Sequence, residues 1–158
     1  MTQPSFGDEA RNMCPHSPRE RLSPFLEISF RADPAAMASV RRGLRAALHE
    51  CGLEEIAEDV VLAAQELMSN AVVHGCRSLA ADTQVTITVA CTTVLLRVAV
   101  HDPSDELPQP RADSDTPESG RGLKITAAVA DRWGVEKHRA DAGKSVWIEL
   151  DSPHDRGL

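Results

Sequence analysis

The stretch from Gln65 to Gly75, QELMSNAVVHG, constrains the fold more than any other part of the sequence. At about 100° per residue, a helix through it gathers apolar side chains on one face. That face consists of Val60, Ala64, Leu67 and Ala71. Glu66, Asn70 and His74 recur at every fourth residue, so on a helix they stack along one side. The pattern predicts a helix packed on a core, with a polar stripe on its flank.

The flank of this helix leaves two interpretations open. Glu66 and Asn70 lie among apolar neighbours, namely Leu62, Ala63 and Val73. A buried polar group without a partner costs about 1–3 kcal/mol, so these two side chains need partners. The partner is a bound ligand in one interpretation and water on a solvated helix face in the other.

Length and charge restrict the class of protein. A chain of 158 residues suits one domain with its own core. The net charge of −7 argues against binding to a nucleic-acid backbone, which needs clustered Lys and Arg. No run approaches the roughly 18 apolar residues of a membrane span, and the N-terminus has no apolar stretch of a secretory signal. We therefore expect a cytoplasmic protein that binds neither a membrane nor nucleic acid directly.

The four cysteines form no CxxC pair and no second pair at zinc-site spacing. They are Cys14, Cys51, Cys76 and Cys91. We expect the last three to be reduced, small hydrophobic residues in or near the core.

The domain boundaries follow from composition. We expect residues 1–22 to be a flexible leader, because they are rich in Pro, Arg, Glu and Ser and show no period. Residues 23–152 should form one domain, and residues 153–158 a short tail. Partial or full alternation predicts strands at 24–30, 85–89, 94–100, 135–139 and 145–150.

Three helices are expected between these strands. Asp33-Pro34 reads as an N-cap followed by proline in the first turn, and Gly52 ends the helix. Its apolar side consists of Met37, Val40, Leu44 and Leu48. Its arginines Arg41, Arg42 and Arg45 are either a solvated face or a protein-binding face. The second helix should run from Glu54 to Gly75, and a third from Leu123 to about Trp133-Gly134.

The segment from Pro103 to Ser119 is acidic, bears prolines and has no large apolar cluster. A segment of this length inside a domain is either a functional lid or a linker. The order strand, helix, helix, strand, strand, lid, helix, strand, strand differs from the alternation of a doubly wound fold. It predicts an α+β, two-layer α/β sandwich, in which helices cover one face of a mixed, mostly antiparallel sheet.

Three features follow one another along the chain: Glu66 with Asn70 on a helix, Asp102 at the end of an apolar strand, and a turn with Gly120, Gly122 and Leu123 that opens a helix. Taken together, they resemble the nucleotide site of the GHKL superfamily of ATPases and kinases. Within that superfamily the chain looks most like the anti-sigma-factor serine/threonine kinases. The most specific segments are ELMSNAVVHG, SGRGL and GKSVWIEL. The resemblance covers about Pro24 to Asp151.

The resemblance implies ATP and Mg²⁺ as cofactors and a role for each residue of the site. Asn70 would bind Mg²⁺ through its side-chain oxygen, and Glu66 would act as the catalytic base toward an attacking hydroxyl. Asp102 would accept a hydrogen bond from the adenine amino group, with Ser145 beside the adenine. Gly120, Arg121, Gly122 and Leu123 would hold phosphate at a helix N-terminus. His74 would either line the site or cap the helix.

The partners that the resemblance implies are a sigma factor and an anti-anti-sigma protein, with a homodimer as a further option. One position departs from the family pattern Asp-x-Gly-x-Gly, because Asp102 is followed by Pro103, Ser104 and Asp105. Two functions therefore stay open. The retained Glu66 favours a kinase that phosphorylates the anti-anti-sigma protein. The missing glycines favour a non-catalytic, nucleotide-dependent switch that sequesters a sigma factor.

Overall fold

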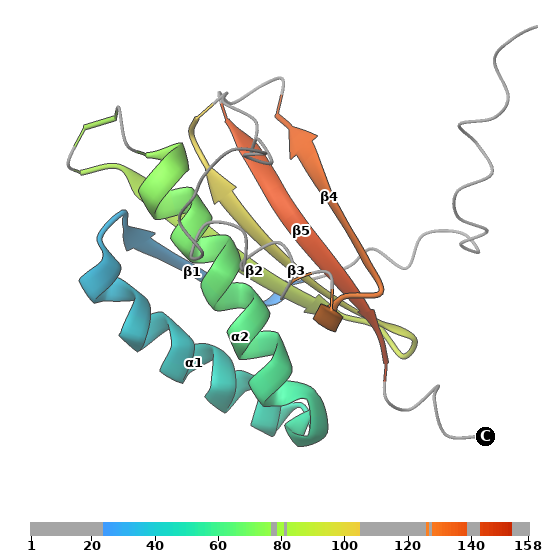
Figure 1. Cartoon of the computed structure of the whole chain (residues 1–158). Helices are drawn as coiled ribbons and strands as arrows, with labels where there is room; N and C mark the ends of the chain where they lie inside the picture. Colours follow the sequence, from blue (N-terminus) through green and yellow to red (C-terminus); the bar gives the residue numbers. More distant parts are fainter. Residues whose placement is uncertain are drawn as a thin grey trace, which may run out of the picture.

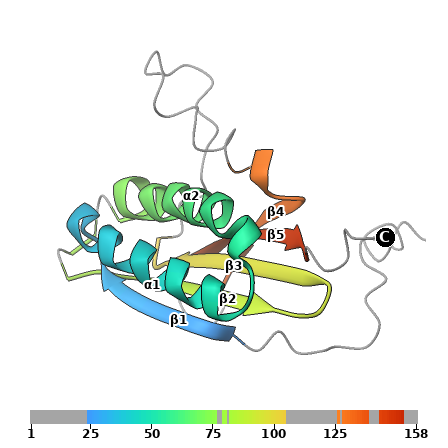
Figure 2. The ribbon, with the colours of Figure 1, turned by 90° about the horizontal axis from the view of Figure 1, so that it is seen from below.

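Antiparallel strands form one open sheet, and two long helices cover one of its faces (Figures 1 and 2). The computed structural model describes residues 24–76, 79–80, 82–104, 126, 128–138 and 143–152. Its strands are β1 (Pro24–Arg31), β2 (Gln84–Cys91), β3 (Leu95–Asp102), β4 (Arg132–Lys137) and β5 (Lys144–Asp151). They lie in the order β1-β2-β3-β5-β4, and every neighbouring pair among these described strands is antiparallel. The predicted α+β sandwich is confirmed.

The two helices follow the predicted signals closely. Asp33 caps a 3₁₀ turn, η2 (Pro34–Ala36), by accepting a hydrogen bond from the Ala35 amide at 2.9 Å. The turn leads into α1 (Met37–Glu50), and Gly52, with a φ of 72°, allows the reversal into α2 (Glu54–Asn70). Helical structure continues from α2 into η3 (Ala71–Gly75), so it ends at the predicted glycine. Of the helices that the structure describes, none is long and apolar enough to cross a membrane.

The core lies between the helices and the sheet. Alternate residues of the central strands, such as Val98 and Val100 of β3, point toward the apolar sides of α1 and α2. The predicted α1 core residues are all buried: Met37, Val40, Leu44 and Leu48. Cys76 is buried and Cys91 packs against the core as predicted, but Cys51 is exposed at the C-terminus of α1.

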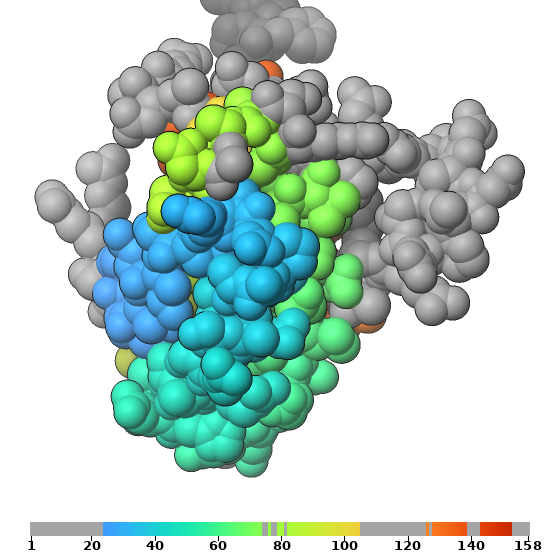
Figure 3. Space-filling view, turned by 90° about the vertical axis from the view of Figure 1, so that its left-hand side faces the viewer, coloured from blue at the N-terminus to red at the C-terminus, as the bar shows by residue number. Residues whose placement is uncertain are grey.

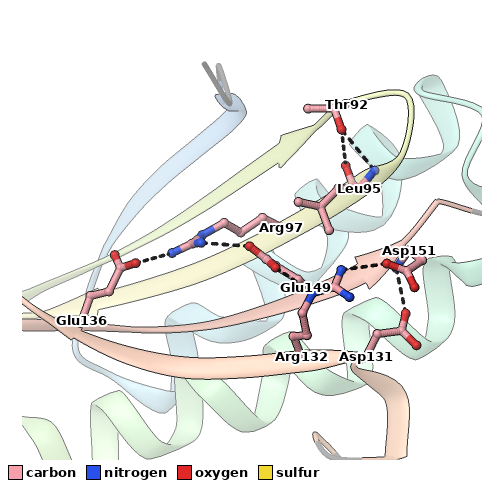
Figure 4. Close-up of polar contacts among 8 residues, drawn as sticks. All are labelled: Thr92, Leu95, Arg97, Asp131, Arg132, Glu136, Glu149 and Asp151. Atoms are coloured by element: carbon pink, nitrogen blue, oxygen red, sulfur yellow. Dashed lines mark hydrogen bonds and ion pairs between the residues drawn. The ribbon is translucent and has the colours of Figure 1, made fainter. Parts of the chain in front are cut away.

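The opposite face of the sheet is polar and held by ion pairs (Figure 4). Arg97 of β3 forms ion pairs with Glu149 of β5 at 3.0 Å and with Glu136 of β4 at 2.8 Å. Arg132 of β4 bonds the same Glu149 at 3.1 Å and Asp151 at 2.7 Å. Since these bonds cross three adjacent strands, they fix the order β3-β5-β4 at this end of the sheet.

The third helix was predicted too long. Thr126, Ala128 and Val129 are helical, and the Ala130 amide donates to the Thr126 carbonyl oxygen at 2.9 Å. Trp133 and Gly134, the predicted helix end, lie instead inside strand β4. The predicted strand 135–139 therefore begins earlier, at Arg132, because this stretch pairs with β5 along its whole length.

The arginines of α1 divide into two groups. Arg41 donates a hydrogen bond to Gln65 of α2, and Arg45 pairs with Glu58 of α2 at 2.7 Å. Arg42 is exposed. Figure 3 faces the side of the molecule where α1 and β1 lie together. Two of the three arginines thus help to hold the helices together, whereas Arg42 keeps the solvent-facing position that either interpretation requires.

Candidate functional site

The polar stripe of α2 runs into a π-helical turn. After Asn70 the backbone widens, and the Cys76 amide donates to the Ala71 carbonyl oxygen five residues earlier, at 3.0 Å. Such turns are rare and occur frequently at functional sites. The α-helical spacing that relates Glu66 to Asn70 therefore ends at this turn. The side chain of His74 lies outside the part of the chain that the structure describes.

Glu66 and Asn70 are both half-buried, one turn apart on α2. Their neighbours differ from the predicted apolar flank, because Ala63 is buried whereas Leu62 and Val73 are exposed. Within the described part of the chain, the side chains of Glu66 and Asn70 hydrogen-bond no other described group. A carboxylate and a carboxamide are therefore available at this helix end, and their oxygens are the ligand type that Mg²⁺ prefers.

Asp102 ends strand β3 on the helix-covered face and is almost completely buried. Its Oδ1 accepts a hydrogen bond from the Ser104 amide at 2.9 Å and forms an ion pair with Lys144 Nζ at 3.0 Å. The Ser104 contact forms a side-chain turn over Pro103, which has no amide hydrogen of its own. This turn stands where the family pattern has glycine, so the chain leaves the strand by a different, stiffer route.

Cys76 shows that the helix end and the Asp102–Lys144 pair lie close together. Burial raises the pKa of the Cys76 thiol, the nearby Asp102 carboxylate raises this pKa further, and the Lys144 ammonium lowers it. The η3 turn that precedes Cys76 also packs directly against β3. The π-helical turn after Asn70, the end of β3 and the start of β5 converge on one place.

A glycine allows the start of β5 to lie very close to the end of β3. Gly143 has a φ of 126°, and a Cβ there would lie 2.8 Å from Pro103 Cα. Only glycine tolerates both the backbone conformation and this contact. The close approach seats Lys144 directly opposite Asp102, its partner in the strand register.

The structure places Ser145, which was predicted beside the adenine, on a different face of the sheet from Asp102. Adjacent residues of a strand point to opposite faces, so Ser145 lies on the face away from Lys144, Asp102 and the helices. Its hydroxyl lies 2.7 Å from His138 Nε2 and 3.4 Å from His101 Nδ1.

Sequence reasoning missed Lys144 for the same reason. Alternation from the buried Ile148 and half-buried Val146 places Lys144, not Ser145, on the inner face of β5. The signal was present in GKSVWIEL, but it was overridden by the small-hydroxyl position expected from the family. The predicted phosphate-binding residues Gly120, Arg121, Gly122 and Leu123 lie outside the described residues, as does nearly all of the predicted lid.

The sequence of this domain matches a family model. Residues 30–150 match the model described as "Histidine kinase-like ATPase domain". The chain belongs to this family. The match includes both helices, the buried Asp102 and the sheet except for most of β1 and the last residue of β5, so the family's ATP-binding function is assigned to the domain described above.

A solved structure shares the fold. It contains the RsbU and RsbW domains of Rv1364c from Mycobacterium tuberculosis, with 23% sequence identity and a TM-score of 0.58. The alignment covers 78% of this chain and 30% of that one. The chain thus corresponds to about a third of that protein. No curated protein sequence matches this chain.

Proposed function

We propose that the chain is a Mg·ATP-binding anti-sigma factor that phosphorylates a serine or threonine of an anti-anti-sigma protein. The observation that carries the proposal is the meeting of the Glu66–Asn70 helix end with the buried Asp102. The family match supports ATP as the nucleotide. The partner class rests on the resemblance of ELMSNAVVHG, SGRGL and GKSVWIEL to anti-sigma-factor kinases, and on the fold shared with a structure that includes an RsbW domain.

The residues present fit this cofactor. The Asn70 carboxamide would hold Mg²⁺, which neutralises triphosphate charge when bound. Glu66, one helical turn earlier, would take the proton from the partner's hydroxyl. Asp102 would accept from the base, and Gly120, Arg121, Gly122 and Leu123 would hold phosphate. His74 would line the site or cap the helix.

A second candidate is a nucleotide-dependent switch that sequesters a sigma factor without transferring phosphate. The turn at Pro103 and Ser104 favours it, because Asp102 Oδ1 is already held by the chain itself. A nucleotide base would therefore have to bind those atoms of Asp102 and Lys144 that are not already engaged with the chain. This arrangement suits slow binding and release of the nucleotide better than tight nucleotide binding with fast turnover.

Phosphate transfer separates the two candidates. The assay mixes the protein, labelled ATP, Mg²⁺ and the anti-anti-sigma-like protein encoded nearest to its gene, and locates the phosphate by mass spectrometry. Glu66→Gln keeps the shape of the side chain but cannot take a proton, so transfer should fall about 10²–10⁴-fold while ATP affinity is retained. Glu58→Gln, on the exposed side of the same helix, is the matched control and should transfer normally.

The outcomes point to different functions. Wild-type transfer that depends on Glu66 supports the kinase. Binding of ATP and of the partner with no transfer supports the switch. Equal transfer by wild type and Glu66→Gln would remove Glu66 from the catalytic role.

A further inference from the structure

Strand β1 forms one edge of the sheet. It pairs with β2, and no other described strand lies beside it. The strand is eight residues long, and its alternate residues Phe25, Glu27, Ser29 and Arg31 are exposed. Figure 3 faces this side of the molecule, where β1 and α1 lie together at the surface. A long edge of this kind presents a row of unpaired backbone groups, to which another strand can bind.

The backbone groups at this edge belong to the same alternate residues. Just after β1, the Ala32 amide donates to the Thr83 carbonyl oxygen at 2.8 Å. Hydrogen-bonded positions alternate along an antiparallel pair, so the even-numbered residues of β1 bond the chain of β2. The backbone amides of Glu27, Ser29 and Arg31 therefore point away from β2, toward the outer edge.

Charge selects one register in which this edge can pair with a second copy of itself. Pairing the outward backbone groups requires odd-numbered residues opposite odd-numbered ones. Registers that place Glu27 opposite Glu27 or opposite Asp33 of the second copy bring like charges together. Another register places Glu27 opposite Ser29 and Arg31 opposite Phe25. Only the register centred on Ser29 places Glu27 opposite Arg31, and symmetry forms that pair twice.

The same register suits the helix-covered face of the sheet. Ile28 would lie opposite Phe30 of the second copy, so the apolar row on the core side of β1 would continue across the junction. The helix α1 covers this row, since a Cβ at Gly43 would lie 3.3 Å from Ile28 Cδ1. At about 100° per residue, the exposed Ser39 and Ala46 lie on the same side of α1 as Gly43. These small side chains leave room for α1 of the second copy.

We propose that β1 is a self-association surface, on which a second copy of this chain pairs antiparallel with Glu27 opposite Arg31. Neither side chain forms an ion pair with a described residue, so both charges are available to the second copy. A symmetric contact of one edge with itself closes after two copies, so the product is a dimer with one continuous sheet. This proposal goes beyond the proposed function and does not depend on nucleotide.

The backbone bonds of this dimer follow from the register. Ser29 exchanges two hydrogen bonds with Ser29 of the second copy, and the Arg31 amide donates to the Glu27 carbonyl oxygen. The Glu27 amide reaches the Arg31 carbonyl oxygen, which already accepts from the Asp33 amide at 2.6 Å. A carbonyl oxygen has two lone pairs, so it can accept both bonds.

Analytical ultracentrifugation of the full chain over a concentration series tests the dimer. Because an edge contact is a small interface, we expect a dissociation constant on the order of 10 µM. Glu27→Arg and Arg31→Glu each turn two attractive pairs into repulsive ones, so each should weaken association at least about tenfold. The two variants change the net charge in opposite directions, so a general charge effect would not weaken both.

Two further variants assign the effect to this pair of residues. The combined variant Glu27→Arg/Arg31→Glu again sets opposite charges face to face, so it should associate as wild type does. Its recovery would also show that neither substitution prevents folding. Arg42→Glu makes the same charge change as Arg31→Glu at an exposed position of α1, and it should leave association unchanged.

Amide hydrogen exchange followed by NMR reads the register. The amides of Glu27, Ser29 and Arg31 should exchange more slowly at high protein concentration than at low concentration. Those of Ile28 and Phe30 bond β2 in either state, so their exchange should not change.

Other results would overturn the proposal. A wild-type chain that stays monomeric at millimolar concentration has no such surface. A dimer that neither single reversal weakens, or that the combined variant does not restore, forms through another part of the molecule. A dimer that only Arg42→Glu weakens forms through α1 instead of β1.

Discussion

The buried Asp102 carboxylate is paired with the Lys144 ammonium. Removing one partner of a buried ion pair typically costs about 3–5 kcal/mol, so Lys144 contributes to folding as well as to the site. The side-chain turn to Ser104 holds the same oxygen from the other direction. This carboxylate is fixed in direction before any ligand arrives, which lowers the cost of ordering it on binding.

A surface ion pair gives a residue-scale prediction with a defined pH dependence. The hydrogen bond from Arg45 holds the pKa of Glu58 below its ordinary value of 4.5. A carboxylate with a lowered folded-state pKa stabilises the protein above its unfolded-state pKa, and this contribution is lost as pH falls through the folded-state value. Glu58→Gln should therefore cause a small loss of stability at pH 7.

Urea denaturation of wild type and Glu58→Gln across pH 3–7 checks this. The difference between them should shrink as the medium becomes more acidic than pH 4.5. A difference that grew toward low pH would contradict the assigned sign. Both side chains are exposed, so the effect at pH 7 should be small and should weaken with added salt.

At the scale of elements, β4 depends on one glycine. A Cβ at Gly134 would lie 2.6 Å from Trp147 Cζ2, on the sheet face where Arg97 stacks on the same indole at 4.4 Å. Gly134→Ala must push apart β4 and β5, and we expect a loss of about 1–3 kcal/mol from overpacking. Denaturation monitored by tryptophan fluorescence measures it.

Gly43→Ala is the matched control for that change. Its Cβ would approach only Ile28 Cδ1, at 3.3 Å, which is the flexible end of a half-buried side chain. Alanine also favours a helix over glycine by roughly 0.5–1 kcal/mol, so this variant should be neutral or slightly more stable. Equal losses at the two glycines would contradict the assigned role of Trp147.

The same glycine explains where sequence reading of the elements failed. The sequence predicts a helix end at Trp133-Gly134, because glycine commonly follows helices. In the structure Gly134 is required opposite the bulky Trp147 of a neighbouring strand. That constraint is tertiary and has no local signature. By contrast, α1 and α2 were predictable, since their caps and apolar periods are local.

At the level of the whole molecule, the sequence was sufficient to predict the two layers. Strand alternation and helical periodicity report which face is buried, and burial determines how the layers stack. The pairing of Asp102 with Lys144 was not predictable, because it depends on the register between strands that are 42 residues apart. The displacement of Ser145 to the other face follows from that register too.

Calorimetric titration tests the proposed role of Asn70, which is to hold the metal of a bound Mg·ATP. Wild type should bind ATP saturably with Mg²⁺, and Asn70→Ala should bind at least about tenfold more weakly, since a metal ligand is lost. Asp59→Ala, an exposed change on the same helix, should bind like wild type. With EDTA the difference between wild type and Asn70→Ala should vanish, because Asn70 acts through the metal. If wild type does not bind at millimolar ATP, or if Asn70→Ala binds equally well in Mg²⁺, Asn70 does not hold the metal of a bound nucleotide.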